Sequence, residues 1–322
     1  MNTSREMFLL TVEEMSFTKA AKKAFITQQG LSSHIKNLEN EYAVKLFERK
    51  PKLTLTKAGE SLYYSLRKIQ IVEKAIQQKL TDIKEGIKGE IILGINSSRA
   101  RILLPRIYAA YHQRFPKVKI SIIMDDMLPL SHRLIDGKID LLLGIDCVVN
   151  KNFNFQAVAE DEVFIVATGT LLEKYADTPE HYRQTLVKGV IDLHNFPKLP
   201  TASNFSGSTL SNLVERYHNY FNIPRNVVLS VSDSAAQISL CTTHQIGAFV
   251  PKSMLQLVME YNRAYKHSGP LKIFKLKGIN EKLRIDFVTN KYSFQPFYME
   301  EFIKLFELEY RKYLAELDKE LL

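Results

Sequence analysis

The sequence predicts an α/β protein in three parts: a small N-terminal domain of short helices with a β-hairpin, one long helix, and a larger C-terminal region of alternating strands and helices. Apolar residues in the first 60 positions recur at helical spacing and are interrupted by short polar turns. Residues 57–86 contain no proline and only one internal glycine, near the start. After Gly89, short apolar runs alternate with helical patterns, which is the order of a parallel sheet with crossover helices.

The N-terminal domain is predicted to contain a helix-turn-helix. A first helix is expected from about Ser4 to Glu14. The second, from about Thr18 to Ala24, is rich in small residues that allow close packing, and Ser16 or Thr18 can cap it with a side-chain oxygen. Thr27 is expected to be the N-cap of a third helix that runs to about Glu41. The buried stripe predicted for that third helix comprises Leu31, Ile35, Leu38 and Tyr42.

The opposite face of the third helix carries hydrogen-bonding side chains and no large apolar ones. Such a face suits the major groove of DNA, where the N-terminal residues of a recognition helix lie nearest the bases. The helix alone could equally be the solvated helix of an ordinary bundle, but a basic strand–turn–strand pattern at residues 48–57 follows it and favours DNA, because its cations would bind phosphates as a wing. The candidate DNA-binding residues are Thr27, Gln28, Gln29, Ser32, Ser33, Lys36, Arg49, Lys50 and Lys52.

The charge of the chain is concentrated where a DNA-binding domain requires it. The 322 residues have a formal net charge of +9, and residues 1–88 hold 16 Lys and Arg against 10 Asp and Glu, a net charge of +6. This excess in one quarter of the chain attracts phosphate backbones. No stretch is long and apolar enough to cross a bilayer and no secretion signal is visible, so we expect a cytoplasmic protein without a membrane partner.

The long helix is expected to join two copies of the chain. Its apolar residues recur every three or four positions, close to the coiled-coil period of about 3.5. The stripe could pack on the N-terminal domain of its own chain, but the same helix of a second chain is favoured, because two-fold pairing presents two recognition helices to two DNA half-sites. The predicted dimerisation residues are Leu62, Leu66, Ile69, Val72, Ile76 and Leu80.

The C-terminal region is predicted to form two α/β subdomains around a ligand-binding cleft. Ligands of such sheets bind at the carboxyl ends of strands, beside helix N-termini whose free N–H groups favour an anion. Arg99 would strengthen that preference if it points inward. Three polar strand-to-helix junctions are as consistent with plain helix capping as with ligand contact. The candidate effector-binding residues are Asn96, Ser97, Ser98, Arg101, Asn204, Ser208, Thr209, Ser232 and Asp233.

The N-terminal motifs resemble those of the LysR-type transcriptional regulators of bacteria. Two positions depart from the family's pattern: Gln29-Gly30 stand where a proline and a small residue are usual, and Ala43 follows Tyr42 where a glycine is usual. The motifs that carry the resemblance are Ser16-Phe17-Thr18 with Ala20-Ala21, Gln28 followed by Ser32 and Ile35, Leu38-Glu39, Leu46-Phe47 with Arg49, and Leu55-Thr56 with Ala58-Gly59.

This resemblance implies a winged helix-turn-helix at residues 1–57, a linker and dimerisation helix at 58–88, and an effector-binding domain at 89–322 that is similar to periplasmic binding proteins. Subdomain I would comprise 89–161 and 268–322, and subdomain II 162–267. The implied function is a sequence-specific transcriptional regulator whose dimer or tetramer geometry is controlled by a small molecule. The implied partners are double-stranded DNA, further copies of the chain, the effector and RNA polymerase.

Catalysis is the rival class of function. The sequence holds no GxGxxG, phosphate loop, HExxH or GxSxG, and its eight histidines lack metal-ligand spacing, so we predict no enzyme, cofactor or metal. Asp125 and Asp126 are adjacent carboxylates, which point to opposite faces if they lie on a strand. Two alternatives remain open: a small-molecule-binding protein with only non-specific DNA affinity, and a redox-responsive regulator that uses Cys147 and Cys241.

Overall fold

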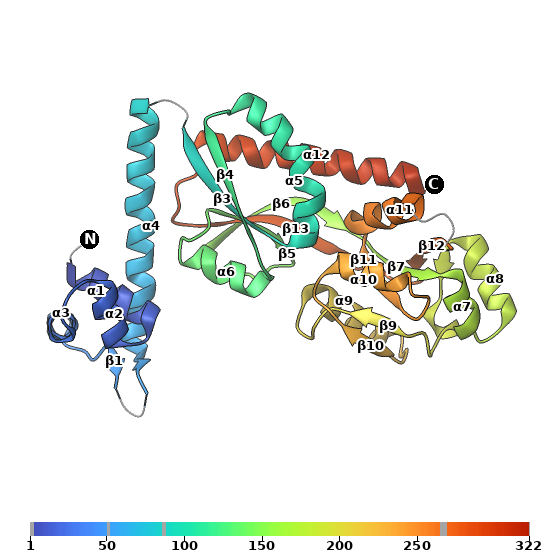
Figure 1. The fold of residues 1–322 in the computed structure, drawn as a ribbon, viewed down its shortest axis with the longest axis horizontal. Helices are drawn as coiled ribbons and strands as arrows, with labels where there is room; N and C mark the ends of the chain where they lie inside the picture. Colours follow the sequence, from blue (N-terminus) through green and yellow to red (C-terminus); the bar gives the residue numbers. More distant parts are fainter. Residues whose placement is uncertain (1–2, 50–51, 86–87, 265–268, 322) are drawn as a thin grey trace. The chain divides into compact units, whose positions relative to one another are not determined.

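The computed structural model describes residues 3–49, 52–85, 88–264 and 269–321, so the predicted DNA contact Lys50 lies outside the described residues. The chain divides into an N-terminal unit and a larger C-terminal unit. The N-terminal unit contains three short helices, a two-stranded hairpin and one long helix (Figure 1). Their bounds are α1 (Thr3–Glu14), α2 (Phe17–Lys23), α3 (Gln28–Glu41), β1 (Phe47–Glu48), β2 (Thr54–Leu55) and α4 (Lys57–Glu85).

The predicted helix starts are confirmed. The Ser16 hydroxyl accepts a hydrogen bond from the Lys19 N–H at the start of α2, and the Thr27 hydroxyl accepts one from the Gly30 N–H, 3.1 Å away, at the start of α3. These caps satisfy backbone donors that have no partner within the helix. Each of the two helices of the helix-turn-helix therefore starts at a polar residue that the sequence marks.

The predicted buried stripe of α3 is right for three of its four members. Leu31, Ile35 and Leu38 are fully buried, whereas Tyr42 is 40 % exposed, so its prediction as a core residue is wrong. The helix ends at Glu41 and the chain turns away, which moves the Tyr42 ring off the helical stripe. Its hydroxyl instead accepts a hydrogen bond from the Arg5 guanidinium.

Two contacts fix the wing against α3 and α4. The buried carboxylate of Glu39 accepts a hydrogen bond of 2.9 Å from the Leu46 N–H, directly before β1. At the start of α4, a Cβ on Gly59 would lie 2.2 Å from the Leu46 carbonyl oxygen, so only glycine permits this approach. The hairpin, which pairs Phe47 with Leu55, is thereby held between the two helices.

The apolar stripe of α4 divides into two parts. Leu62 and Leu66 pack into the core of their own N-terminal domain, and Leu66 is only 1 % exposed. Side chains that pack into the core of their own chain are not available to a second one, so Leu62 and Leu66 are both removed from the six predicted dimerisation residues. The remaining four predicted residues are exposed in the single chain: Ile69, Val72, Ile76 and Leu80.

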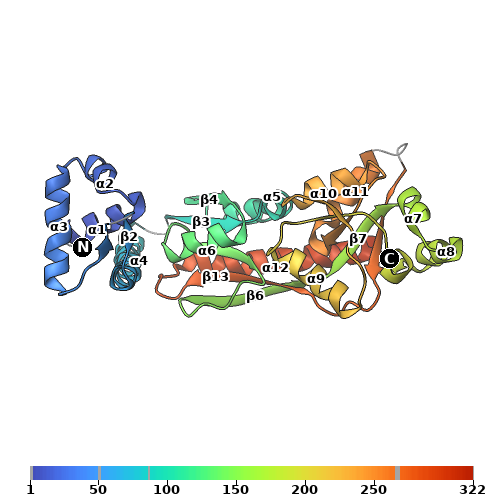
Figure 2. The same cartoon turned by 90° about the horizontal axis from the view of Figure 1, so that it is seen from below.

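The C-terminal unit contains two sheets, and Figure 2 shows β6 leading from the first sheet toward β7 of the second. The first sheet has the strand order β4-β3-β5-β13-β6, with β3 parallel to both β4 and β5 and β13 antiparallel to β5. Its strands are β3 (Gly89–Ile95), β4 (Val118–Met124), β5 (Leu141–Ile145), β6 (Phe153–Asp161) and β13 (Leu283–Asn290). Its helices are α5 (Ser97–Arg114), α6 (Met127–Ile135) and α12 (Phe297–Leu321).

The second sheet has the order β10-β9-β11-β7-β12-β8. Its strands are β7 (Val163–Thr168), β8 (Val190–Ile191), β9 (Thr201–Ser203), β10 (Val227–Ser230), β11 (Gly247–Pro251) and β12 (Leu271–Leu276). Its helical segments are α7 (Gly169–Tyr175), α8 (Pro179–Lys188), η1 (Leu193–Asn195), α9 (Thr209–Tyr220), α10 (Ser234–Cys241), η2 (Lys252–Met254) and α11 (Leu255–Ala264). The two sheets form subdomains I and II of the predicted sensor.

The chain crosses between the subdomains twice. The first crossing falls at Glu162, between β6 and β7, and the second falls between β12 and β13. Because β12 pairs with β7 and β8 in the second sheet, the predicted start of the returning part of subdomain I at residue 268 is too early. Subdomain I resumes only after Leu276.

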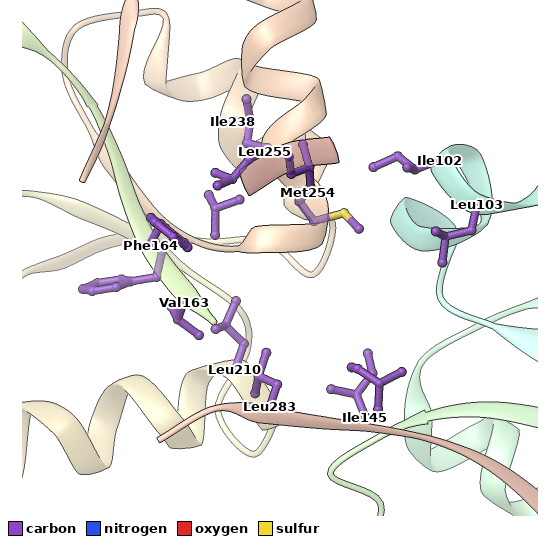
Figure 3. Packing of buried hydrophobic residues seen from close by; sticks show 14 of the residues in the cluster. Ile102, Leu103, Ile145, Val163, Phe164, Leu210, Ile238, Met254, Leu255 and Leu283 are labelled. Atoms are coloured by element: carbon purple, nitrogen blue, oxygen red, sulfur yellow. The ribbon is translucent and has the colours of Figure 1, made fainter. Parts of the chain in front are cut away.

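One apolar core runs through both subdomains. Figure 3 shows Ile102 and Leu103 of α5 and Ile145 of β5 on one side, and Met254 and Leu255 on the other. All five side chains are at most 9 % exposed and belong to the same cluster of packed residues. Burial of apolar surface stabilises folding by about 25 cal/mol per Å². The shared core therefore makes the two subdomains one cooperative unit with two sheets.

Replacing Ala43 by glycine is expected to stabilise the N-terminal domain. Ala43 lies just after α3 with φ +52°, a left-handed conformation that L-residues with a Cβ adopt at a cost of about 1–2 kcal/mol. Part of the gain is lost to the greater freedom of glycine in the unfolded chain, so we expect a net gain of about 0.5–1 kcal/mol. Chemical denaturation of the variant measures it.

The matched control is Ala24→Gly at the end of α2, where φ is −82°. That substitution should destabilise the domain, because glycine there relieves no strain and only adds freedom to the unfolded chain. A gain at both positions, or at neither, would contradict the account.

Candidate functional site

The N-terminal half of α3 presents the polar face that the sequence predicts. Thr27, Gln28, Gln29, Ser33 and Lys36 are exposed. Ser32 is half-buried, and Lys52 of the hairpin is exposed. This face lies opposite the buried stripe of α3 and is open to solvent.

The structure brings helix and wing together around one hollow. A cavity of about 350 Å³ is lined by Gln28 and Ser32 of α3 and by Arg49 and Leu53 of the hairpin, together with Met15, Ser16 and Phe17. The Arg49 guanidinium lies 4.8 Å from the centre of the Phe17 ring, a cation–π contact that orients it. Three residues predicted as DNA contacts therefore share one surface.

Sequence reasoning did not include Thr18 in this surface. Its hydroxyl donates a hydrogen bond of 3.3 Å to the Gln28 side-chain oxygen, and this bond fixes the orientation of the Gln28 amide. Thr18 is exposed on α2. The only sequence signal for this role was that Thr18 is a polar residue at the start of α2.

The second candidate site lies where subdomains I and II meet. Asp233, the N-cap of α10 in subdomain II, accepts hydrogen bonds from the Ser98 hydroxyl at 2.8 Å and the Ser97 hydroxyl at 3.1 Å, both at the start of α5 in subdomain I. Desolvation alone would raise the pKa of the Asp233 carboxyl. The Ala236 N–H, the two serine hydroxyls and the charge of Arg101 outweigh it and lower the pKa, so this carboxylate is ionised at neutral pH.

A polar cavity of about 220 Å³ opens beside this bridge. It is lined by residues from three junctions at the carboxyl ends of strands: Asn96, Ser97, Met124, Asp125, Asp126, Ser232 and Asp233. Four of the predicted effector contacts are among them. Asp125 and Asp126 follow the end of β4 and both line the cavity, so the expectation that they point to opposite faces is wrong, because they stand in a loop and not on a strand.

The other predicted effector contacts are engaged elsewhere. The Ser98 hydroxyl is buried in the bridge to Asp233. Asn204 donates to the Ser232 carbonyl and accepts from Gln237. Ser208 caps α9, and Thr209 donates to the Ile145 carbonyl across the subdomain boundary. For these four residues, the structure therefore supports roles in helix capping and in holding the wall of the cavity.

Arg101 lies on a neighbouring apolar groove. This groove has a volume of about 520 Å³ between α5 and β4, and it shares Ser97 and Met124 with the polar cavity. Its remaining lining residues are Ala100, Leu104, Pro105, Ile107, Tyr108, Ile120, Ile122 and Phe302. The polar cavity therefore continues into an apolar surface.

Arg99 does not point into the cavity, so the condition under which it would favour an anion is not met. It is 5 % exposed, and its guanidinium donates a hydrogen bond of 3.0 Å to the fully buried carboxylate of Asp161. That carboxylate also accepts from the Ser253 N–H at 3.0 Å and the Ser253 hydroxyl at 2.6 Å. The Ser253 carbonyl in turn accepts from the Tyr313 hydroxyl at 2.7 Å. This buried network joins α5 and α12 of subdomain I to subdomain II at the first crossing.

The two cysteines are buried and free. Desolvation raises the pKa of the Cys147 thiol and raises that of Cys241 to about 12, so little thiolate is present for oxidation. Among the described residues, no group of three or more His, Cys, Asp or Glu side chains is placed to hold a metal ion. No helix within those residues is long and apolar enough to span a membrane.

Comparison with known families decides the assignment. Residues 4–60 match the bacterial regulatory helix-turn-helix protein, lysR family, and residues 84–307 match the LysR substrate binding domain. The chain belongs to the LysR-type transcriptional regulators. These two matches cover the winged domain with its candidate DNA surface and the two-subdomain sensor with its cavity.

Relatives of this LysR-type regulator are transcriptional regulators and not enzymes. A probable RuBisCO transcriptional regulator of Thalassiosira pseudonana is 24 % identical over 289 residues, which cover 88 % of this chain and 89 % of that protein. The corresponding regulator of Trieres chinensis is 31 % identical over 158 residues, which cover 48 % of this chain and about half of that protein, 51 %. The alignment with the second relative thus spans only half of its length.

The solved structure of full-length CbnR in complex with its target DNA has a similar fold. The TM-score is 0.58 at 16 % sequence identity, with 95 % of this chain and 98 % of that chain covered. A likeness at this identity shows a shared fold over nearly the whole length of both chains. The contacts of individual residues with DNA or effector rest on the geometry of this chain.

We expect Lys36→Ala and Arg49→Ala to weaken binding to every DNA sequence, because exposed cations bind phosphates and position the protein. Each should reduce the slope of log affinity against log salt by about 1. Ser32→Ala and Gln28→Ala should instead change the preferred sequence, because hydrogen bonds to base edges carry specificity. Fluorescence anisotropy over a set of duplexes and salt concentrations distinguishes the two effects.

The matched control is Lys312→Ala on α12 of the sensor, which removes an exposed lysine outside the DNA-binding domain. Its affinity and salt slope should equal those of the unaltered protein. Equal loss on all duplexes for Ser32→Ala would contradict a role in base recognition.

Asp161→Asn is expected to destabilise the sensor by about 3–5 kcal/mol, because it leaves the buried Arg99 guanidinium without a counter-charge. Arg99→Met together with Asp161→Asn should recover part of the loss, since no unpaired charge then remains buried. Denaturant titration of the unaltered protein and the two variants measures both effects. An equal loss in the single and double variants would contradict the ion-pair account.

Proposed function

We propose that this regulator binds specific double-stranded DNA through α3 and the wing and that a small-molecule effector controls its assembly. The observation that carries the proposal is the gathering of Gln28, Ser32 and Arg49 around one hollow beside an exposed polar helix face. Hydrogen-bonding side chains from a helix and a cation from a wing provide base recognition and phosphate binding on one surface. Membership of the family supplies the regulatory role.

The effector site that we propose is the polar cavity at the subdomain junction. Its walls come from α5 and β4 of subdomain I and from the segment before α10 in subdomain II. A ligand that contacts both walls has a different affinity for each arrangement of the subdomains, which is the requirement for a conformational response.

We propose an anionic effector, and Asp233 determines how it would bind. The Ser97 and Ser98 hydroxyls at the N-terminus of α5 are donors that suit an anion, but the Asp233 carboxylate accepts both of them. An anionic effector would therefore have to replace Asp233 as their acceptor. This exchange would break the bridge between the subdomains and couple binding to their rearrangement. Asp125 and Asp126 oppose an anion, so a ligand that offers amine donors is the competing outcome.

We propose self-association through the exposed stripe of α4. Ile69, Val72, Ile76 and Leu80 are between 40 % and 61 % exposed in the single chain and recur at spacings of three, four and four residues. Pairing of two such helices would bury the stripe and present two recognition helices to two half-sites. A tetramer, contact with RNA polymerase and a cytoplasmic location complete the proposal.

Selection of genomic fragments by the purified full-length protein, followed by footprinting, tests the DNA-binding function. A protected site with two-fold symmetry is the expected result. Binding that depends on salt but prefers no fragment would overturn specific recognition and favour a small-molecule-binding protein with only non-specific DNA affinity.

Asp233→Asn is expected to increase affinity for small carboxylates, because it removes the charge that competes with them while the Ser97 and Ser98 hydroxyls remain. Isothermal titration with a panel of carboxylates and size-matched amines measures the preference. The control is Asp192→Asn, which removes a carboxylate that pairs with Lys277 and His194 away from the cavity. The proposal of an anionic effector would be contradicted if the unaltered protein binds an amine, Asp233→Asn abolishes that binding, and neither protein binds a carboxylate.

A further inference from the structure

Phe25, in the turn between α2 and α3, is the most exposed large apolar residue of the described chain. Its side chain is 96 % accessible to solvent. An aromatic ring buries about 150–250 Å² when it finds a partner, so a fully exposed ring forgoes a large stabilising contact. The packing of the single chain gives no reason for a phenylalanine at this position.

The backbone at Phe25 makes the choice of residue more unusual. Its φ angle is +56°, in the left-handed region. The N–H of Phe25 donates to the Lys22 carbonyl, and the N–H of Ile26 donates to the Ala21 carbonyl at 3.1 Å, which closes the end of α2. Glycine or asparagine is preferred at this position of a helix end, because other residues are strained there. Phe25 therefore reduces the stability of the turn and gains no internal contact.

Phe25 lies beside the end of α3 that is proposed to contact DNA. The residue stands two positions before Thr27, the N-cap of α3, and three before Gln28. The N-terminal end of a recognition helix is the end nearest the bases. Lys22, in the last turn of α2, is also exposed, so cationic and apolar groups occur together in this turn. A local strain that persists without a structural reason indicates a functional one.

We propose that Phe25 contacts DNA through its ring, against a deoxyribose or the 5-methyl group of a thymine at the edge of the major groove. Phenylalanine is suited to both surfaces, and apolar contact with the thymine methyl carries sequence information. This inference rests on the proposed DNA-reading surface of α3 and the wing. It adds an apolar contact to a surface that otherwise recognises DNA through hydrogen bonds and charge.

The test uses Phe25→Asn in the full-length protein, because asparagine tolerates the left-handed backbone and lacks the ring. Amides of α2 and α3 should exchange with deuterium more slowly than in the unaltered protein, while affinity for a selected duplex falls on the order of tenfold, a change of about 1.4 kcal/mol. Phe25→Tyr should keep most of the affinity. A more stable turn with weaker binding is a result that damage to the fold does not produce.

The matched control is Ala43→Asn, at the other end of α3, where φ is also positive and the residue is also exposed. It should stabilise the domain and leave DNA affinity unchanged. Replacing thymine by deoxyuridine throughout the duplex removes the methyl groups and so distinguishes the two surfaces. If the unaltered protein loses affinity for this duplex and Phe25→Asn causes no further loss, Phe25 contacts the methyl group. If the unaltered protein keeps its affinity, Phe25 contacts the deoxyribose.

Unchanged affinity of Phe25→Asn for every duplex would overturn the inference, as would an equal loss in Ala43→Asn. Loss of transcriptional response with unchanged DNA affinity would also overturn it and assign Phe25 to a protein partner. Lys36→Ala and Arg49→Ala are assayed in parallel. If they weaken binding and Phe25→Asn does not, only this inference fails; if none of the three weakens binding, the proposed surface fails as a whole.

Discussion

The buried carboxylate of Asp161 is the joint on which the arrangement of the sensor depends. It ends β6 at the first crossing and accepts hydrogen bonds of 2.6–3.0 Å from Arg99 of subdomain I and Ser253 of subdomain II. Taking two charges out of water is expensive, and the three hydrogen bonds that the Asp161 carboxylate accepts offset part of that cost. The apolar core that surrounds it continues from one subdomain into the other. Any relative motion of the subdomains must therefore leave this joint intact or break it at great cost.

The bridge from Asp233 to Ser97 and Ser98 differs from that joint in its exposure to ligands. It crosses the same boundary, but it borders a cavity and is made by two neutral hydroxyls and one carboxylate. Hydrogen bonds of this kind contribute about 0.5–3 kcal/mol each, which a bound molecule can replace. The boundary thus includes a buried connection at Asp161 and a connection at Asp233 that a ligand could exchange. That pairing suits a sensor whose two halves must stay folded together while their arrangement responds to a ligand.

The sequence anticipated the elements whose signals are strong and local. Helix caps at Ser16 and Thr27 and three of the four predicted buried positions of α3 follow from side-chain chemistry and period, and they were found where predicted. The strands β6 and β12 give only a weak apolar signal in the sequence, because each alternates buried residues with exposed charged or polar ones. Since β12 precedes the second crossing, the boundary of subdomain I was predicted too early, at residue 268. Tyr42 was misassigned because the period of a helix does not reveal where the helix stops.

By itself, the sequence determined the class of the protein and predicted the candidate DNA surface, because a helix with its wing lies within 60 consecutive residues and its faces follow from spacing. Only the tertiary structure decided which polar junctions form the cavity. Asp125 and Asp233 are far apart in the sequence, and their meeting depends on how two sheets pack. The same packing turned Arg99 away from the cavity and toward Asp161. A side chain's partner across a subdomain boundary is fixed by the fold as a whole, and no local pattern encodes it.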